Sequence, residues 1–430
     1  MGGSHAHPHA VETRRMRRVA WVVVTALALV TLGAMVWLWP GDDVPAPATP
    51  AAEEQNARVV ALHPEPCPAD VTPGVNGCGT ATVELVEVGQ TVVVDLPNGP
   101  GAPLIADGDE VVVIAIPGLD EEQYGIVDHQ RSTGLWVLCL AFVVALLAFG
   151  RWRGLSALAG LGVTFVVLLF FVVPAILAGE PPLFVALAGS AAITLTVLYL
   201  THGVTMTSTV AVIGTLASLA LTGALAAVSV NALSLSGITD DISASVSDRY
   251  GITMSGLLVA SIVIGSVGVL DDVTVTQANI VSELARANPS YGFGQLYSAA
   301  SRVGRSHIAS VVNTIVLAYA GASLPLLILV AADNPSFGDV LTTQFISQEI
   351  VRSIVATLGL IAAVPLTTVL AAYAARAAGA GRADKAGGAA AASGAEPSAD
   401  PEVAGASTVS PDGVSEERGS RRARTPPRGG

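Results

Sequence analysis

The chain has 430 residues, of which 52% are hydrophobic and only 13% are charged, and its formal net charge is −13. This composition excludes an ordinary soluble globular domain and places the chain among membrane proteins. We therefore expect the lipid bilayer to be its main partner, with a second copy of the chain or an envelope protein as further candidates, and no nucleic acid.

Apolar runs long enough to cross a bilayer set the predicted architecture, because a membrane helix needs about 20 apolar residues. Eight runs qualify: Val19–Trp39, Gly134–Phe149, Leu155–Leu177, Leu183–Leu200, Val204–Val228, Ile252–Leu270, Ile308–Ala331 and Ile350–Ala372. The sequence thus predicts an α-helical polytopic membrane protein with about eight transmembrane helices. A small β-rich domain is inserted between the first helix and a seven-helix domain over residues 132–374.

The arginines predict the orientation, because positively charged flanks tend to stay in the cytoplasm. They lie before the first run, after the second, between the sixth and seventh, and after the last: Arg14, Arg15, Arg17, Arg18, Arg151, Arg153, Arg286, Arg302, Arg305 and Arg376. If the runs alternate in direction, all of these residues fall on one side. We therefore expect a plasma-membrane protein with both termini in the cytoplasm, including an N-terminal segment over residues 1–18.

The first apolar run, over residues 19–39, has two interpretations. A basic start followed by an apolar stretch is shared by cleaved signal peptides and membrane anchors. The run has about 20 residues and lacks a clear small-x-small cleavage site before Pro40, which favours an anchor that is not cleaved.

Residues 40–131 are predicted to lie outside the cytoplasm and to form the β-rich domain. The segment begins with the linker GDDVPAPATPAAEEQ, which has too few large apolar residues to fold. Strand-like runs follow, separated by turn residues: ARVVAL, TATVELVEV, QTVVVDLP and DEVVVIAIP. Four or five short strands predict a small barrel or sandwich, since a lone hairpin is marginal in water.

The negative charge of the protein belongs to this segment, which has about 16 acidic residues against Arg58 and Arg131. Attraction of cations or repulsion of anionic envelope polymers is one interpretation. An ordinary solvated surface is the more common one.

Two of the three cysteines, Cys67 and Cys78, fall in the same segment. An oxidising exterior makes a disulfide between them the natural expectation. Cys139 lies in an apolar run and is expected to be an ordinary buried thiol.

Both ends of the chain are predicted to lack fixed structure. Residues 375–430 are expected to form a disordered cytoplasmic tail, because from about Gly379 the sequence is rich in Ala, Gly, Ser and Pro without periodicity. The opening HAHPHA contains three histidines on an unstructured end, and no metal site is expected there.

The sixth apolar run continues into polar residues that keep to one helical face. They recur every three or four positions: Ser261, Gly265, Gly268, Asp272, Thr276, Asn279 and Glu283. After Pro289 a second helix returns with its own stripe at Arg302, Ser306, Ser310, Asn313 and Leu317. Antiparallel packing about the turn would place Glu283 near Arg302, and Asp272 near Ser310 and Asn313. The sequence predicts that the two stripes face each other.

Asp271 and Asp272 are the residues hardest to reconcile with lipid, because an isolated carboxylate there costs roughly 2.5 kcal/mol or more. A substrate, ion or proton path and a simple anchor among the headgroups are equally good interpretations. The candidate path residues are Asp271, Asp272, Thr276, Asn279, Glu283, Arg302, Ser310, Asn313 and Thr314. In the last run, Glu349 and Arg352 are spaced for an ion pair near the outer face.

Several segments, SELARANP, GRSHIASVVNTIVLAYAGASLPLL and QEIVRS, identify a family. Together with the Asp271–Asp272 pair they resemble the YibE/F family of bacterial multi-span membrane proteins, over roughly Thr80 to Ala372. The resemblance implies a polytopic membrane protein and supplies no catalytic residues.

Two functions follow from these residues. The first is a permease-like transporter of a small solute or ion, with the sixth and seventh helices lining the path. The second is a non-transporting envelope scaffold whose β domain binds a partner. No HExxH, GxSxG or P-loop pattern occurs in the sequence, so we expect neither an enzyme nor a cofactor.

Overall fold

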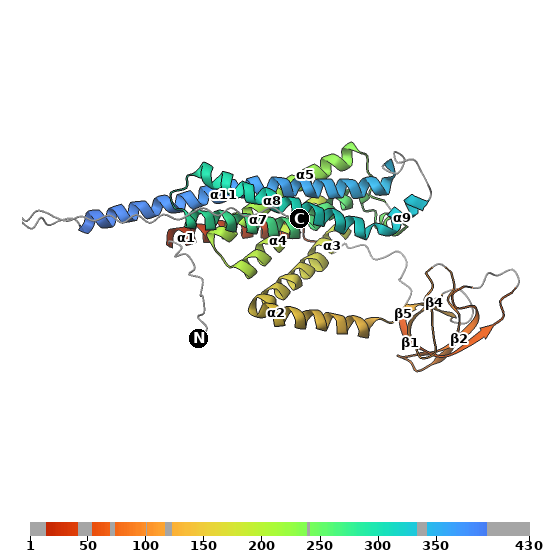
Figure 1. The fold of residues 1–430 in the computed structure, drawn as a ribbon. Coiled ribbons are helices and arrows are strands. Elements are labelled where there is room, and N and C mark those ends of the chain that lie inside the picture. Colours follow the sequence, from red (N-terminus) through yellow and green to blue (C-terminus); the bar gives the residue numbers. More distant parts are fainter. Residues whose placement is uncertain are drawn as a thin grey trace, which may run out of the picture. The chain divides into compact units, whose positions relative to one another are not determined.

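The structure is a computed structural model, and it describes residues 14–41, 54–68, 74–99, 101–116, 123–238, 241–332 and 342–393 (Figure 1). The chain divides into two compact units, Met1–Ala380 and Gly381–Gly430. The features below belong to the first unit, apart from the end of the last helix. The predicted linker, the histidine-bearing start and residues 394–430 lie outside the described residues.

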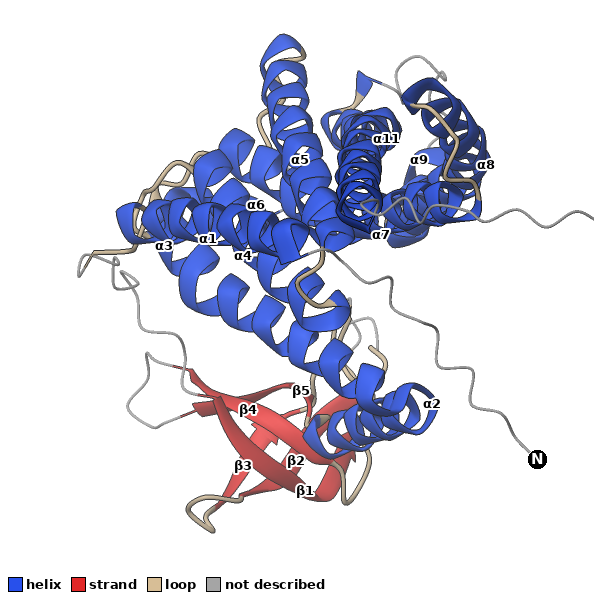
Figure 2. Ribbon diagram, turned by 90° about the vertical axis from the view of Figure 1, so that its left-hand side faces the viewer, coloured by secondary structure: helices blue, strands red, loops and turns tan. Residues whose placement is uncertain are grey.

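The β-rich segment is a closed barrel, as Figure 2 shows. Its strands are β1 (Glu54–Glu65), β2 (Cys78–Leu85), β3 (Thr91–Asp95), β4 (Glu110–Ile116) and β5 (Gln123–His129), in the order β1-β2-β3-β5-β4. Neighbours are antiparallel, except that β3 meets β5 in parallel at Asp95 and Gly125. Of the two predicted architectures, the barrel is the correct one. The sequence did not single out β5, whose QYGIVDH lacks strong alternation.

The barrel core follows the two-residue period of its strands, because alternate side chains point to opposite faces. In β2, for example, Ala81, Val83 and Leu85 are buried. The core consists of Ala57, Val59, Ala81, Val83, Leu85, Val94, Leu96, Ile105, Val111, Val113 and Ile126.

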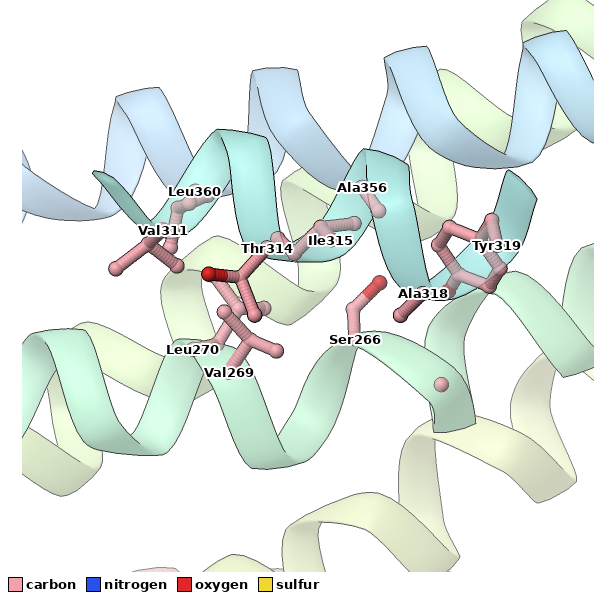
Figure 3. Close-up of a pocket in the computed structure, with 11 residues that line it drawn as sticks. Ser266, Val269, Leu270, Val311, Thr314, Ile315, Ala318, Tyr319, Ala356 and Leu360 are labelled. Atoms are coloured by element: carbon pink, nitrogen blue, oxygen red, sulfur yellow. The ribbon is translucent and has the colours of Figure 1, made fainter. Parts of the chain in front are cut away.

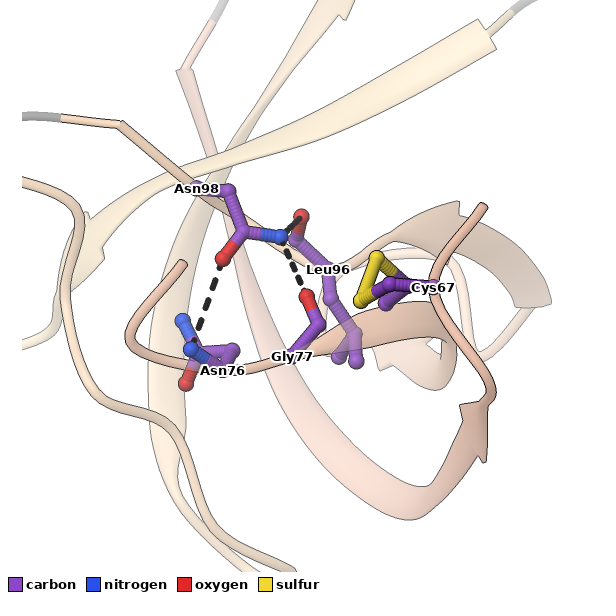
Figure 4. Close-up of a disulfide and its surroundings, with 6 residues drawn as sticks. Cys67, Asn76, Gly77, Leu96 and Asn98 are labelled. Carbon is purple, nitrogen blue, oxygen red and sulfur yellow. Dashed lines mark hydrogen bonds between the residues drawn. A yellow bond between two sulfur atoms is a disulfide. The ribbon is translucent and has the colours of Figure 1, made fainter. Parts of the chain in front are cut away.

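The predicted disulfide between Cys67 and Cys78 is confirmed, with the two Cα atoms 5.1 Å apart (Figure 4). Beside it, the side chain of Asn98 donates hydrogen bonds to the carbonyl oxygens of Gly77, at 2.7 Å, and Leu96, at 3.1 Å. Gly79 has φ +130°, and a Cβ there would lie 2.1 Å from the carbonyl oxygen of His63. The close pairing of β1 and β2 at this point therefore requires a glycine.

The remaining elements are helical. They are α1 (Arg14–Trp37), α2 (Ser132–Val167), η1 (Leu168–Val172), α3 (Val173–Leu177), α4 (Pro182–His202), α5 (Met206–Ala232), α6 (Asp241–Tyr250), α7 (Met254–Ala287), α8 (Phe293–Ala322), α9 (Leu324–Ala332) and α11 (Gln344–Ser393). Among the described residues, six helical stretches are long and apolar enough to span a membrane: Met16–Trp37, Ser132–Leu177, Pro182–His202, Met206–Ala232, Met254–Ala287 and Gln344–Ala378. This arrangement is compatible with a multi-pass membrane protein, but the predicted number of eight spans is not confirmed.

Two of the predicted spans are continuous in the structure. Gly134–Phe149 and Leu155–Leu177 both lie within the 46-residue stretch Ser132–Leu177. The helix is interrupted only at Arg151, with φ 50° and ψ −126°, where the ribbon of α2 turns (Figure 1). A Cβ on Gly154 would lie 2.4 Å from the carbonyl oxygen of Leu146, so the two halves approach closely at the break. The chain thus reverses at one residue and needs no loop.

The predicted span Ile308–Ala331 is divided between α8 and α9. The helix breaks next to Pro325, because proline lacks the amide hydrogen that an inner helical turn requires. α11 differs from the prediction at its other end, since it continues to Ser393, well past Gly379 where the tail was expected to begin. Alanine is the strongest helix former, and the stretch beyond Gly379 is rich in it.

The helices around α7 pack through apolar side chains and glycines. Ile193 of α4, Leu219 of α5, Leu270 of α7 and Leu360 of α11 lie in one buried cluster. Small residues let helix backbones approach closely, as is common in membranes. A Cβ on Gly214 of α5 would lie 2.3 Å from Oγ1 of Thr367 on α11, and one on Gly359 of α11 would lie 2.0 Å from Oγ1 of Thr222 on α5. These contacts fix hydroxyl groups between the helices.

Candidate functional site

A layer of buried polar side chains crosses the helix bundle. It is formed by α4, α5, α7 and α11, and consists mainly of hydroxyl groups. Its members are Ser190, Thr194, Thr209, Thr215, Ser218, Thr222, Ser266, Thr274, Gln277, Thr367 and Thr368, all of them at most 3% exposed. In lipid, such groups are expected to turn inward and find hydrogen-bond partners across helices.

Asp271 is the carboxylate that joins this layer, and it lies at the middle of α7. Oγ1 of Thr194 on α4 donates to its carboxylate, at 3.2 Å from Oδ1 and 3.4 Å from Oδ2. The hydroxyl of Thr215 on α5 also lies near this side chain, and its own hydrogen-bond contacts are with Ala211 and Thr274. Oγ1 of Thr274 lies 2.7 Å from Oγ1 of Thr215 and donates to the backbone carbonyl oxygen of Asp271, at 3.1 Å. Asp271 is thus partly buried among hydroxyl groups of three helices.

This carboxylate has no cationic partner among the described residues. The ion pairs found there are His129–Asp109, Arg131–Asp128, Arg286–Glu283 and Arg352–Glu349. Neither α4 nor α5 contains an arginine, lysine or acidic residue, and the one histidine in them, His202, is the last residue of α4. Among the described residues, the negative charge of an ionised Asp271 is therefore stabilised by the dipoles of neighbouring hydroxyl groups and not by a positive charge.

A second polar contact ties α7 to its other neighbours. Nε2 of Gln277 donates to the carbonyl oxygen of Ala300 on α8, at 3.1 Å, and to Oγ1 of Thr368 on α11, at 2.7 Å. Gly304 leaves the necessary room, because a Cβ there would lie 2.7 Å from Oε1 of Gln277. This buried amide links three helices. Part of the polar layer therefore serves helix packing and needs no functional explanation.

The predicted polar stripes do not meet as expected. Asp272, Asn279, Glu283, Arg302, Ser310, Asn313 and Thr314 are exposed, and Thr276 is partly buried. Glu283 pairs with Arg286 of its own helix, at 2.8 Å, instead of with Arg302. The reason lies in α8, which buries its apolar and small residues Leu296, Ala300, Gly304 and Ile315, and so turns its polar stripe outward. Whether these residues line a path stays a prediction.

α7 and α8 do border a pocket, together with α11, but it is half open and mainly apolar. This cavity of about 370 Å³ is lined by Gly265, Ser266, Val269, Leu270, Val311, Thr314, Ile315, Ala318, Tyr319, Ala356 and Leu360. Figure 3 shows Ser266 of α7 and Thr314 of α8 in the space between the two helices. Of the predicted path residues only Thr314 lines it, so the polar groups at Asp271 lie elsewhere on α7.

Glu349 and Arg352 form an ion pair on α11, with Nη1 of Arg352 3.0 Å from Oε1 of Glu349. Both side chains are partly buried. Their mutual neutralisation explains how two charged residues are accommodated on this apolar helix.

Sequence reasoning identified Asp271 but missed the residues around it, which are Ser190, Thr194, Thr215 and Thr274. The hydroxyls of α4 and α5 are flanked by apolar residues, and Thr274 lies off the helical face on which the predicted polar stripe of α7 was counted. A usable signal was present in α5, where Thr215, Ser218 and Thr222 recur every three or four positions and thus share one face.

The comparisons with known proteins agree with the sequence segments that suggested a family. The family model described as YibE/F-like protein matches residues 138–377. The matched residues include α4, α5, α7, α8 and most of α2, but not the barrel, which had been included in the expected region of similarity. No curated protein and no solved structure matches the chain. The match covers more than half of the chain, which therefore belongs to the YibE/F family.

Proposed function

We propose that the protein is a permease-like transporter of a small solute or ion in the plasma membrane, with both termini in the cytoplasm. The observation that carries this proposal is the carboxylate of Asp271 at the middle of an apolar helix, held by hydroxyl groups and unpaired with any described cation. An ionisable group at such a position is expensive in lipid, and its usual role is in the passage of an ion, a proton or a substrate.

The proposal moves the centre of the path from the α7–α8 pair to the junction of α4, α5 and α7. Buried hydroxyl groups of α4 and α5 supply oxygen atoms near Asp271. By contrast, the predicted path residues of α8 are exposed: Arg302, Ser310, Asn313 and Thr314. Asp272 was the central residue in the sequence-based hypothesis, and the two adjacent aspartates therefore distinguish the two versions of the path.

The test uses the full-length protein reconstituted in lipid vesicles, with sodium ions, protons and a panel of labelled amino acids and sugars as probes. We expect at least one flux above that of empty vesicles, and we expect Asp271→Asn to lower it by about tenfold or more, corresponding to about 1.4 kcal/mol. Asp272→Asn should leave most of the flux intact. Transport is contradicted if no probe moves, or if Asp271→Asn transports like the wild type.

The scaffold hypothesis retains one supporting observation, which is that the barrel has a closed sheet, its own apolar core and a disulfide. Replacing residues 42–131 by a short flexible linker separates the two hypotheses. A transporter of the proposed kind retains its Asp271-dependent flux after this deletion. A scaffold that acts through the barrel shows no such flux before the deletion and loses its envelope partner after it.

A further inference from the structure

The carboxylate of Asp271 is short of hydrogen-bond donors. Each threonine hydroxyl has one hydrogen, while an ionised carboxylate offers about four acceptor positions. Oγ1 of Thr274 donates to the backbone carbonyl oxygen of Asp271, at 3.1 Å. Thr215 has one hydrogen and two acceptors within hydrogen-bond distance, which are the carbonyl oxygen of Ala211 at 3.1 Å and Oγ1 of Thr274 at 2.7 Å, while its hydroxyl also lies near the Asp271 carboxylate. Thr194 is the only described side chain that donates to the carboxylate at hydrogen-bond distance. Most of the acceptor positions of the carboxylate therefore have no donor among the described side chains.

None of the charged residues described on the neighbouring helices forms an ion pair with Asp271 to compensate for this shortage. The charged or titratable residues on the helices around Asp271 include Arg17 and Arg18 on α1, Tyr199 and His202 on α4, Asp272, Glu283 and Arg286 on α7, Arg302, Arg305, His307 and Tyr319 on α8, and Glu349, Arg352, Tyr373 and Arg376 on α11, whereas α5 has none. None of them is hydrogen-bonded or ion-paired with Asp271. Arg286, the nearest arginine on α7 itself, is 15 positions away, or about 22 Å along a helix. Since no described residue forms an ion pair with Asp271, a bound species is the source of positive charge that the proposal below assigns to this position.

A further buried hydroxyl, that of Ser190, lies one helical turn from Thr194 on α4. Ser190 precedes Thr194 in the sequence and shares its face. Its side chain is only 1% exposed, and its hydroxyl has no hydrogen-bond partner among the described residues. A buried hydroxyl without a partner is destabilising unless something binds to it. Ser190, Thr194, Thr215 and Asp271 thus provide one carboxylate and three hydroxyl oxygens on three adjoining helices.

We propose that these four residues form a binding site for a small monovalent cation, either a sodium ion or a proton. One carboxylate neutralises one positive charge, whereas a divalent ion would leave an uncompensated charge inside the bundle. Oxygen donors suit hard cations, and the described residues contain no cluster of three or more His, Cys, Asp or Glu residues that could hold a transition metal. The inference rests on the proposed transport function for its biological role, because it names the ion that accompanies or constitutes the transported species.

A binding experiment tests the site without relying on transport. The midpoint of thermal unfolding of the purified protein in detergent is measured while sodium chloride replaces choline chloride at constant ionic strength. If sodium is the ion, the midpoint of the wild type rises by about 2 °C or more at about tenfold excess over the dissociation constant. Asp271→Asn abolishes the rise, Thr194→Val weakens the apparent affinity by about tenfold, and Thr194→Ser restores it. Asp272→Asn, next in sequence and exposed, serves as the matched control and retains the rise.

Labelling with an apolar carbodiimide distinguishes the proton from sodium, because the reagent reacts with protonated carboxyl groups. Protection of Asp271 by sodium chloride identifies sodium. Labelling that falls as the pH rises, without an effect of sodium, identifies the proton. The site is refuted if no sodium-dependent shift depends on Asp271 and the labelling of Asp271 does not vary with pH.

The binding result and the transport result can be separated. Asp271-dependent binding in a protein that moves no probe supports the site and contradicts transport. Flux without Asp271-dependent binding or labelling refutes the site and leaves transport in place.

Discussion

The barrel and the helix bundle fill their interiors in opposite ways. All buried side chains of the barrel core are apolar, from Ala57 on β1 to Ile126 on β5. Every buried polar side chain in the described part of the chain lies in a helix, among them Thr194, Thr215 and Gln277. In α2, large apolar side chains lie on the outside of the protein, where Phe149 is 97% exposed and Trp136 is 75% exposed.

The difference shows that one chain has two burial patterns, one typical of a protein in water and one typical of a protein in lipid. The barrel has the pattern of a protein in water, with apolar residues inside and charged residues such as Glu84 and Glu110 outside. The bundle has the pattern of a protein in lipid, where an apolar exterior costs nothing and polar groups must find partners inside. The boundary between the two patterns falls at Arg131, between β5 and α2.

The largest effect is expected from removing the disulfide, because a small barrel depends on such a bond more than a large bundle does. Cys67 and Cys78 are 11 positions apart, and the double change Cys67→Ser with Cys78→Ser should destabilise the barrel by about 3 kcal/mol. Hydrogen exchange of peptides from β2 and β3 in the full-length protein should accelerate, while peptides from α5 and α7 stay protected. Cys139→Ser is the control, because that cysteine is free and exposed, and the expectation that it would be buried was wrong. Its helix α2 turns many of its apolar side chains outward. Equal loss of protection in both regions would contradict the comparison.

An intermediate effect is expected from exchanging one residue type between the two interiors. Val83 in the barrel and Thr222 in the bundle are both fully buried. Val83→Thr places a hydroxyl without a partner in an apolar core and should cost about 1–3 kcal/mol. Thr222→Val removes a hydroxyl that donates to the carbonyl oxygen of Ser218 of its own helix, and should cost only about 0.6 kcal/mol or less.

Local hydrogen exchange of β2 peptides measures the first change, and thermal unfolding in detergent measures the second. The distinction between the two burial patterns would be wrong if Thr222→Val lowered stability more than Val83→Thr.

The smallest effect is expected at the water-exposed end of the barrel. The guanidinium of Arg131 donates to both carboxylate oxygens of Asp128, at 2.5 and 2.7 Å, and lowers the pKa of Asp128 below its ordinary value of 3.8. The backbone amide of His129 also donates to Asp128, at 2.8 Å, and lowers this pKa further. Because the folded-state pKa is depressed, the contribution to stability is present above pH 3.8 and is lost as the pH falls through the folded-state pKa.

Comparison of hydrogen exchange in β5 between the wild type and Asp128→Asn checks this pH dependence, since intrinsic exchange rates cancel. The two proteins should converge at acidic pH and differ slightly at neutral pH. A difference that grows on acidification would have the wrong sign.

The sequence predicted those features that depend on short-range patterns. Alternation in TATVELVEV gave β2, the cysteine spacing gave the disulfide, and the apolar runs gave most of the long helices. The helix through Asp271 was also predicted to continue past the apolar run, and α7 does continue to Ala287.

Features that depend on which helices become neighbours could not be predicted. The polar stripe of α8 looked like the side that should pack, but Leu296, Ala300 and Gly304 allow closer contact with α7 and are buried instead. The partners of Asp271 come from helices about 77 and 56 positions earlier, and periodicity within one helix does not report such contacts. The sequence separated two spans between Phe149 and Leu155, but it did not show that the break consists of one residue with positive φ, Arg151, with helix on both sides.

The position of Asp271 also determines how the protein would respond to voltage. A carboxylate at the middle of a membrane-crossing helix lies within the electric field of the bilayer, where moving one charge across the full thickness corresponds to about 2.3 kcal/mol per 100 mV. With the proposed cation bound, the site would be electrically neutral, and displacing it would involve no electrical work. Without the cation, the same displacement would move a negative charge through the field. The membrane potential would therefore shift the conformational equilibrium of the empty form but not that of the occupied form.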